Sequence, residues 1–239
     1  MKTVNKINDY DNKQKLWRYV KPDRLIDILN KKEIYFSSAT QFTDDPYEGA
    51  IAIKPQGMEI QQDNNFEHAF AELRRLTKIT CWHMSDCEND AMWKLYADSK
   101  KGFAITTTIE TLIESLEPYR IKPNYRSETL HVGKIQYINL MEEKVNTNVL
   151  ERFFYKHNAF SWENEFRLAI SLRMAEEVGV SVPEHGILVK VNPTILINNI
   201  YLGPSIDKQD RKKILNVCEE HGITDKIRIS SLLGNPIYS

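Results

Sequence analysis

The sequence has few of the features that mark secreted, membrane-spanning or duplex-binding proteins. It holds three cysteines in 239 residues, an odd number that gives no disulfide framework, so we expect reduced thiols. No run of 18 apolar residues occurs, and the N-terminus lacks the apolar stretch of a signal peptide, which predicts a cytoplasmic protein without a membrane partner. The 32 Lys and Arg residues are balanced by 33 Asp and Glu residues. The chain therefore lacks the net positive charge that favours binding to duplex nucleic acid.

Several common catalytic motifs are also missing. The chain has neither a Gly-x-x-x-x-Gly-Lys loop nor a Gly-x-Gly-x-x-Gly turn, and no serine or cysteine nucleophile elbow, which disfavours P-loop, Rossmann and kinase functions. The composition, 41% hydrophobic and 27% charged, is that of an ordinary globular protein. We predict a flexible N-terminal arm over residues 1–15, which are polar, and a single α+β domain over residues 16–239.

Apolar periodicity predicts the order of the elements. Strands are predicted over residues 16–20, 34–38, 79–84, 102–108, 132–138, 166–172, 187–191, 197–202 and 227–231. Helices are predicted over residues 22–32, 65–78, 90–96, 110–116, 149–157 and 207–221. Pro22, Asn89 or Asp90, and Gly222 supply start and stop signals, and residues 118–127 have the prolines of a loop. Because the strands gather late in the chain instead of alternating with helices, the fold class is α+β.

The most informative local pattern is Trp162-Glu163-Asn164-Glu165-Phe166-Arg167, which runs into the apolar residues 168–170. If the whole pattern is a strand, its period of two places Glu163, Glu165 and Arg167 on one face, with two carboxylates beside a guanidinium. The alternative interpretation is a solvated strand face with a surface ion pair, which stabilises little.

Three further groups have both a functional and a plain structural interpretation. Cys81, His83 and Cys87 are residue types that bind zinc, but the sequence offers no obvious fourth ligand. The structural interpretation is a half-buried cysteine thiol and a hydrogen-bonded histidine. The cations and tyrosines of residues 119–126 could bind and stack on a nucleotide or a single-stranded nucleic acid. The structural interpretation is a solvated loop. Tyr96, near Trp93, suits stacking on a planar ring, and otherwise belongs to the core.

Taken in order, these segments resemble a bacterial family known as domain of unknown function 2971, over nearly the whole chain after residue 15. The residues that match are Leu16-Trp17-Arg18-Tyr19, Phe36-Ser37-Ser38, Asp45-Pro46-Tyr47-Glu48, Met92-Trp93, Tyr96-Ala97-Asp98, Gly102-Phe103, Glu163-Asn164-Glu165-Phe166-Arg167 and Tyr201-Leu202-Gly203. Their order also resembles the layout of ADP-ribosyltransferases, which implies a split β-sheet with flanking helices and NAD as substrate.

The resemblance implies roles for individual residues. Glu165 would be the catalytic carboxylate, and Glu163 would orient or deprotonate the acceptor nucleophile. The residues implied to bind NAD are Arg18, Tyr19, Ser37, Ser38, Tyr96 and Arg167. Within this set, Ser37 or Ser38 would also hold Glu165 in place, and Tyr96 would stack on nicotinamide.

The implied function is ADP-ribose transfer from NAD or NAD hydrolysis, in a toxin or an anti-phage defence effector. The acceptor would be a protein or a nucleic acid, and an antidote or partner protein would accompany it. One alternative is a non-catalytic module that binds a nucleotide or nucleic acid, in which Glu163, Glu165 and Arg167 form a structural network. Another is a metal-dependent nuclease that uses the cysteine and histidine set, or the acidic Asp44, Asp45 and Glu48.

Overall fold

The computed structural model describes residues 2–55 and 64–238. It divides into two compact units, each built from three stretches of chain. Unit 1 comprises Met1–Tyr10, Tyr35–Cys81 and Pro118–Val189, and unit 2 comprises Asp11–Ile34, Trp82–Glu117 and Lys190–Ser239.

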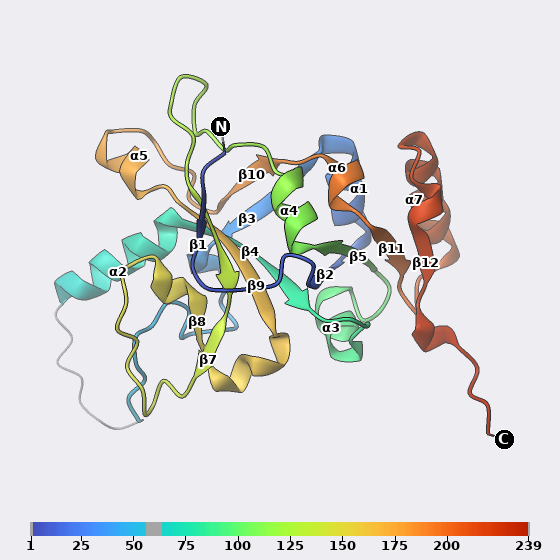
Figure 1. Cartoon of the computed structure of the whole chain (residues 1–239), viewed down its shortest axis with the longest axis horizontal. Helices are drawn as coiled ribbons and strands as arrows, with labels where there is room; N and C mark the ends of the chain where they lie inside the picture. Colours follow the sequence, from blue (N-terminus) through green and yellow to red (C-terminus); the bar gives the residue numbers. More distant parts are fainter. Residues whose placement is uncertain (1, 56–63, 239) are drawn as a thin grey trace. The chain divides into compact units, whose positions relative to one another are not determined.

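Unit 1 is a mixed sheet with short helices (Figure 1). Its strands are β1 (Val4–Lys6), β3 (Glu33–Ser38), β4 (Thr77–Met84), β6 (Leu130–Lys134), β7 (Gln136–Ile138), β8 (Tyr155–His157), β9 (Glu165–Ser171) and β10 (Gly186–Lys190), where β3, β4 and β10 each extend into unit 2 at one end. Its helices are α2 (Asn64–Leu76) and α5 (Arg173–Glu177), with 3-10 turns at Ala39–Gln41, Glu151–Phe154 and Asn158–Glu163.

The strand order of unit 1 places β9 inside the sheet. The order is β1-β6-β9-β4, with β3 paired to β4 and β10 paired to β3, while β7 and β8 form a separate parallel pair. β1 and β6 are parallel, and β6 and β9 are antiparallel with Val132 opposite Leu168. β9 has sheet neighbours on both sides, and Glu165 to Ile170, which point to both faces of the sheet, are all buried.

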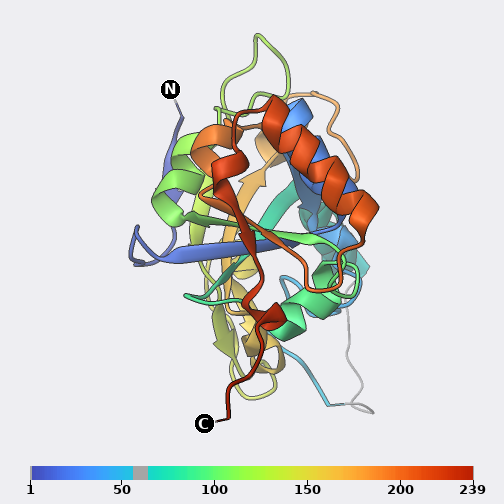
Figure 2. The same cartoon turned by 90° about the vertical axis from the view of Figure 1, so that its right-hand side faces the viewer.

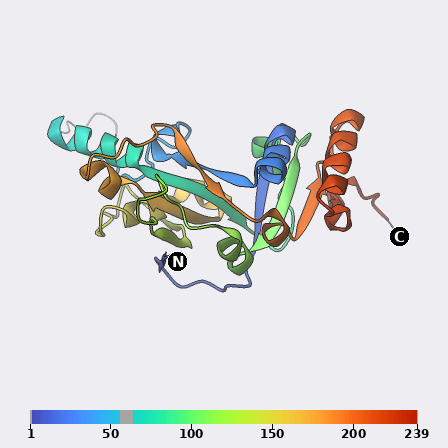
Figure 3. The same ribbon diagram turned by 90° about the horizontal axis from the view of Figure 1, so that it is seen from above.

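In unit 2, helices flank a set of paired strands. Its strands are β2 (Lys15–Val20), β5 (Phe103–Thr108), β11 (Asn199–Leu202), β12 (Ile227–Ile229) and the end of β4, in the order β4-β2-β5-β11-β12. Its helices are α1 (Pro22–Lys31), α3 (Asp90–Tyr96), α4 (Ile109–Ser115), α6 (Pro193–Leu196) and α7 (Lys208–Glu220), with 3-10 turns at Thr224–Lys226 and Ser231–Leu233. Figures 2 and 3 show α1 and α7 on one face of this sheet and α4 with α6 on the other.

These units confirm the α+β class, since a mixed sheet is flanked by helices in each. The predicted helix signals are also confirmed. Pro22 opens α1, the Asn89 side chain accepts hydrogen bonds from the first turn of α3, and Gly222 follows α7 with φ +65°. Backbone N–H groups at a helix start have no partner within the helix, which explains why such residues locate the boundary.

Two predicted elements are wrong in their details. Residues 149–157 form a 3-10 turn and then β8, although Leu150, Phe153 and Phe154 have the i, i+3, i+4 spacing of one helical face. Residues 132–138 form two strands, since β6 ends at Lys134 and β7 begins at Gln136.

The stretch predicted as a flexible arm contains β1, which pairs with β6. The ring of Tyr10, at its end, packs edge-on against Phe166 with centroids 5.0 Å apart. Within the described ranges, none of the helices combines the length and apolar character needed to span a bilayer.

Candidate functional site: a buried cluster of carboxylates and cations

The cluster is built at the entry to β9, where the backbone changes conformation within one residue. Glu163 ends a 3-10 turn, Asn164 is left-handed with φ 42° and ψ 60°, and the strand begins only at Glu165. The strand predicted over residues 166–172 forms as β9, but the condition that the whole pattern 162–167 is a strand does not hold, because the left-handed Asn164 separates Glu163 from the strand. Asn is among the few residues that adopt this region readily.

Arg167 lies at the deep end of the cluster and binds two carboxylates. Its Nη1 donates to Glu48 Oε1 at 2.6 Å and its Nη2 to Glu48 Oε2 at 3.1 Å. Nη2 and Nε also donate to Glu165 Oε2, at 3.0 and 3.3 Å, and Nη1 donates to the carbonyl oxygen of Phe153. The planar guanidinium suits this arrangement because its donors form a rigid fork.

Lys156 lies at the other end and binds the two glutamates that the sequence singled out. From β8, its Nζ donates to Glu165 Oε1 at 2.9 Å and to Glu163 Oε2. The Asp45 Oδ2 atom lies 3.6 Å from the same nitrogen. Glu163, Glu165 and Arg167 therefore do converge, although only Glu165 and Arg167 share a strand.

Burial shows that this is not a surface ion pair. Arg167 is 0% exposed and Glu48 1%, whereas Glu165 and Glu163 keep 6% and 8% of their surface. The interpretation as a solvated strand face is therefore wrong. The cluster has an enclosed end at Arg167 and Glu48, and an end nearer solvent at Glu163 and Glu165.

The two glutamates have opposite pKa shifts. Burial alone would raise the pKa of Glu165, but the charges of Arg167 and Lys156 outweigh it and hold that pKa well below its ordinary value. Burial, together with a hydrogen bond to Glu165, raises the pKa of Glu163 to about 7. Near neutral pH, Glu165 is therefore ionised while Glu163 holds a proton for part of the time.

The groups around the pair respond to the same burial and charge. Burial raises the pKa of Glu48 despite its contact with Arg167. Burial, and then the nearby Glu165 carboxylate, raise the pKa of the Cys81 thiol, so this cysteine is a hydrogen-bonded thiol and not a thiolate. The Tyr137 hydroxyl accepts a hydrogen bond from the Glu165 backbone N–H at 2.9 Å, and burial raises its pKa.

Ser37 and Ser38 lie in β3 of the same unit. Ser38 is fully buried, and its hydroxyl donates to the carbonyl oxygen of Arg75 at 2.9 Å, at the end of α2. Ser37 is half-buried and lies opposite Ile79 in β4. The carboxylate of Glu165 is held by Lys156 and Arg167, the role that the sequence led us to expect of a serine.

Arg18, Tyr19 and Tyr96 belong to unit 2. The Arg18 guanidinium lies over the Trp82 ring, 5.4 Å from its centroid. Tyr19 is buried, its ring meets Trp93 edge-on at 5.0 Å, and its hydroxyl accepts a hydrogen bond from the Asn89 N–H. Tyr96 is 44% exposed at the end of α3. Their assignment to NAD binding stays a prediction.

Sequence reasoning missed Lys156 and the true role of Glu48. A usable signal was present in β9, where Arg167 interrupts a run that is apolar on both faces of the strand. A cation that must be buried needs carboxylates, and Asp45 and Glu48 lie on either side of Pro46 in one turn. Lys156 gives no such signal, because one lysine in a short segment is most often exposed.

The metal-site interpretation finds no support in the part of the chain that the structure describes, where no group of three or more His, Cys, Asp or Glu side chains is arranged to hold a metal ion. Asp45 and Glu48, which the nuclease alternative used, face Lys156 and Arg167. Cys81 is half-buried beside Glu165, and Cys87 is exposed.

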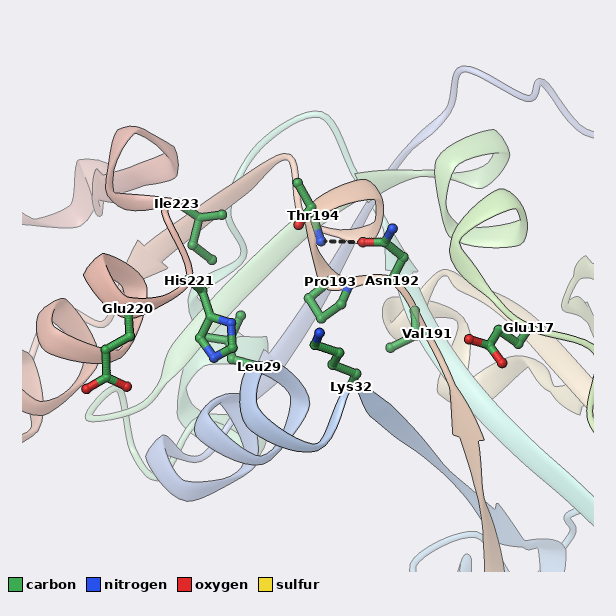
Figure 4. Close-up of a pocket in the computed structure, with 10 residues that line it drawn as sticks. All are labelled: Leu29, Lys32, Glu117, Val191, Asn192, Pro193, Thr194, Glu220, His221 and Ile223. Atoms are coloured by element: carbon green, nitrogen blue, oxygen red, sulfur yellow. Dashed lines mark hydrogen bonds between the residues drawn. The ribbon is translucent and has the colours of Figure 1, made fainter.

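A separate polar pocket of about 530 Å³ lies in unit 2 (Figure 4). The ends of α1 and α7 and the start of α6 form it, and its polar lining consists of Lys32, Glu117, Asn192, Thr194, Glu220 and His221. The residues predicted for NAD binding and catalysis lie elsewhere in the chain. The Asn192 side chain in this pocket is used locally, as it accepts the Thr194 N–H at 3.0 Å.

Comparison with known families agrees with the family resemblance noted above for one stretch of the chain. Residues 92–168 match the family described as protein of unknown function (DUF2971). Among curated proteins, none matches the sequence. Two solved structures of DarT from Thermus sp. 2.9 are similar: one in complex with ADP-ribosylated ssDNA, at 7% identity and TM-score 0.36, and one in complex with carba-NAD+, at 11% identity and TM-score 0.34. The alignments cover 93% and 92% of this chain, and 96% of each DarT chain.

Proposed function

We propose that this chain binds NAD and either transfers its ADP-ribose to a macromolecule or hydrolyses it, with Glu165 as the catalytic residue. One observation supports this most strongly. Glu165 is held ionised in a nearly dry environment, at the end of the cluster that keeps some exposure, while the enclosed end anchors it through Arg167.

The chemistry suits such a carboxylate. Nicotinamide leaves NAD as a neutral molecule from a cationic ring, so no general acid is needed, and the group to stabilise is an oxocarbenium-like ribose. Four carboxyl groups, Asp45, Glu48, Glu163 and Glu165, share two cations in the cluster. The excess of acid favours positive charge that develops beside Glu165, and a fixed charge in a water-poor site acts more strongly than one in water.

The second glutamate has the pKa of a proton acceptor that works near neutrality. A general base is most effective when its pKa lies close to the working pH. Glu163, with a pKa of about 7, would take the proton of the acceptor nucleophile or of water. The acceptor would be a protein or a nucleic acid, and a role as toxin or anti-phage effector with an antidote belongs to this same proposal.

The experiment is nicotinamide release from NAD by the purified chain and by Glu165→Gln, with cell extract supplied as acceptor. We expect release by wild type and a loss of about 100-fold or more in Glu165→Gln. The matched control is Glu177→Gln, which removes a carboxylate from the exposed Arg173–Glu177 pair of the same unit. The proposal fails if wild type releases no nicotinamide and NAD does not raise its melting temperature, or if both variants lose activity equally.

A second candidate is the non-catalytic nucleotide-binding module, which the buried ion-pair network favours. In this case Glu165 serves stability alone. Glu165→Gln would then lower the melting temperature and leave ligand affinity unchanged, whereas the enzyme proposal requires turnover to fall by far more than stability explains. Calorimetric titration of NAD into both proteins separates the two functions.

A further inference from the structure

Lys156 contacts both glutamates of the Glu-x-Glu pattern. It reaches them from β8, while Glu163 lies in a 3-10 turn and Glu165 in β9. Its ammonium has three protons, and three carboxylate oxygens face it, from Glu163, Glu165 and Asp45. The side chain is 4% exposed, so water does not replace these contacts.

The placement gives the ammonium a function that Arg167 does not have. Arg167 contacts Glu165 and Glu48 but is bonded to Glu165 through Oε2 alone. The other oxygen, Oε1, is bound by Lys156. Without Lys156, Glu165 would keep its anchor while Glu163 would lose its bonded cation, and the two carboxyl groups would share one proton.

We propose that Lys156 is a positioning residue of the carboxylate pair: it fixes the direction of both carboxyl groups and divides their roles, so that Glu165 stays ionised and Glu163 is the group that exchanges a proton. This deepens the proposed function, on which it rests for its catalytic meaning. The claim about protonation concerns the chain alone and can be measured without NAD.

The charged and titratable groups around Glu163 come from every neighbouring element. Lys156 faces it from β8, Glu165 from β9 and Tyr137 from β7, and Asp45 shares its lysine. Arg167 from β9 and Cys81 from β4 act on Glu165. Lys156 lowers the pKa of Glu163 while Glu165 raises it. Removal of the lysine should therefore move the titration of Glu163 upward, because two carboxylates close together then lack their shared cation.

The test is carbon NMR of the glutamate carboxyl groups as a function of pH, with Glu163→Gln to assign the resonance. We expect a midpoint near 7 in wild type, a rise of about one pH unit or more in Lys156→Met, and a midpoint within about half a unit of wild type in Lys156→Arg. The control is Lys78→Met, which removes another fully buried lysine of the same unit that donates only to backbone carbonyls. Its midpoint should equal that of wild type.

An unchanged midpoint in Lys156→Met, or an equal rise in Lys78→Met, would overturn the proposal. If Lys156→Met loses its folded spectrum, Lys156→Gln is judged by the same criterion. The rate of nicotinamide release is then measured as a function of pH, which tests the catalytic part of the proposal. The inflection of this pH profile that is assigned to Glu163 should shift together with the NMR midpoint. An absence of release from every protein would remove the NAD function, and the NMR result would still decide the role of Lys156.

Discussion

Arg167 and Glu48 form a two-pronged ion pair between residues 119 positions apart in the chain, and both side chains are enclosed. Two charges removed from water in this way give little net stability as a pair, but each is costly without the other. The pair therefore makes the turn at residues 45–49 depend on β9.

The first prediction concerns this pair. We expect Glu48→Gln to lower the free energy of unfolding by about 3–5 kcal/mol, because Arg167 loses a buried counter-charge. The control is Glu177→Gln in the exposed Arg173–Glu177 pair, which should cost less than about 1 kcal/mol. Urea unfolding measures both, and similar losses in the two variants would contradict the buried role.

The second prediction is that the contribution of Glu163 to the free energy of unfolding falls as pH rises. The pKa of Glu163 is about 7 in the folded chain against 4.5 ordinarily, so its contribution is complete below pH 4.5 and disappears as pH rises through 7. Relative to Glu163→Gln, wild type should lose about 2–3 kcal/mol between pH 5 and pH 8. Parallel curves of unfolding free energy for the two proteins would show that Glu163 does not titrate in this window.

The third prediction is that the contribution of Lys78 to the free energy of unfolding rises with pH. Lys78 is fully buried, and burial lowers its pKa to about 8 from 10.5. Its contribution is complete above pH 10.5 and is lost as pH falls through 8. Relative to Lys78→Met, the free energy of unfolding of wild type should therefore rise by about 2–3 kcal/mol from pH 7 to pH 10. The control is Lys134→Met, at an exposed lysine. Its free energy of unfolding should depend on pH as that of wild type does.

The fourth prediction separates backbone strain from a steric clash. Gly49 has φ +75°, and an added Cβ would lie 2.7 Å from Cε1 of Phe153. Gly179 has φ +77°, with nothing within 4 Å of an added Cβ. Gly179→Ala should cost about 1 kcal/mol from the backbone alone, and Gly49→Ala at least about 1 kcal/mol more from the clash. Equal costs in urea unfolding would mean that Phe153 moves aside freely.

The elements that the sequence predicted well are those with local causes. β2, α1 and α7 lie within one or two residues of their predicted bounds because apolar period, Pro22, Asp207 and Gly222 act over a few residues. The helix predicted over residues 149–157 is wrong because Leu150, Phe153 and Phe154 have helical spacing, although the chain forms a 3-10 turn and a strand there. Local patterns do not contain the tertiary burial that decides such a case.

The cluster was half predictable for a related reason. The spacing of Glu163, Glu165 and Arg167 singled out the right side chains, but their partners come from distant segments, Glu48 from before α2 and Lys156 from β8. No spacing rule connects residues that far apart. The alternative interpretation as a solvated strand face was wrong, because such faces are solvated in most proteins and this one is enclosed.

The left-handed Asn164 has a consequence for how this site can vary among related sequences. Two side chains at alternate positions reach the same lysine across one left-handed residue, at which the chain passes from the 3-10 turn into the strand. A residue branched at Cβ would resist that conformation, whereas Asn, Asp and Gly accept it. Chains that keep the pair in working geometry should therefore show Glu-Asn-Glu, Glu-Asp-Glu or Glu-Gly-Glu, and a valine or isoleucine in the middle would indicate a pair that no longer acts together.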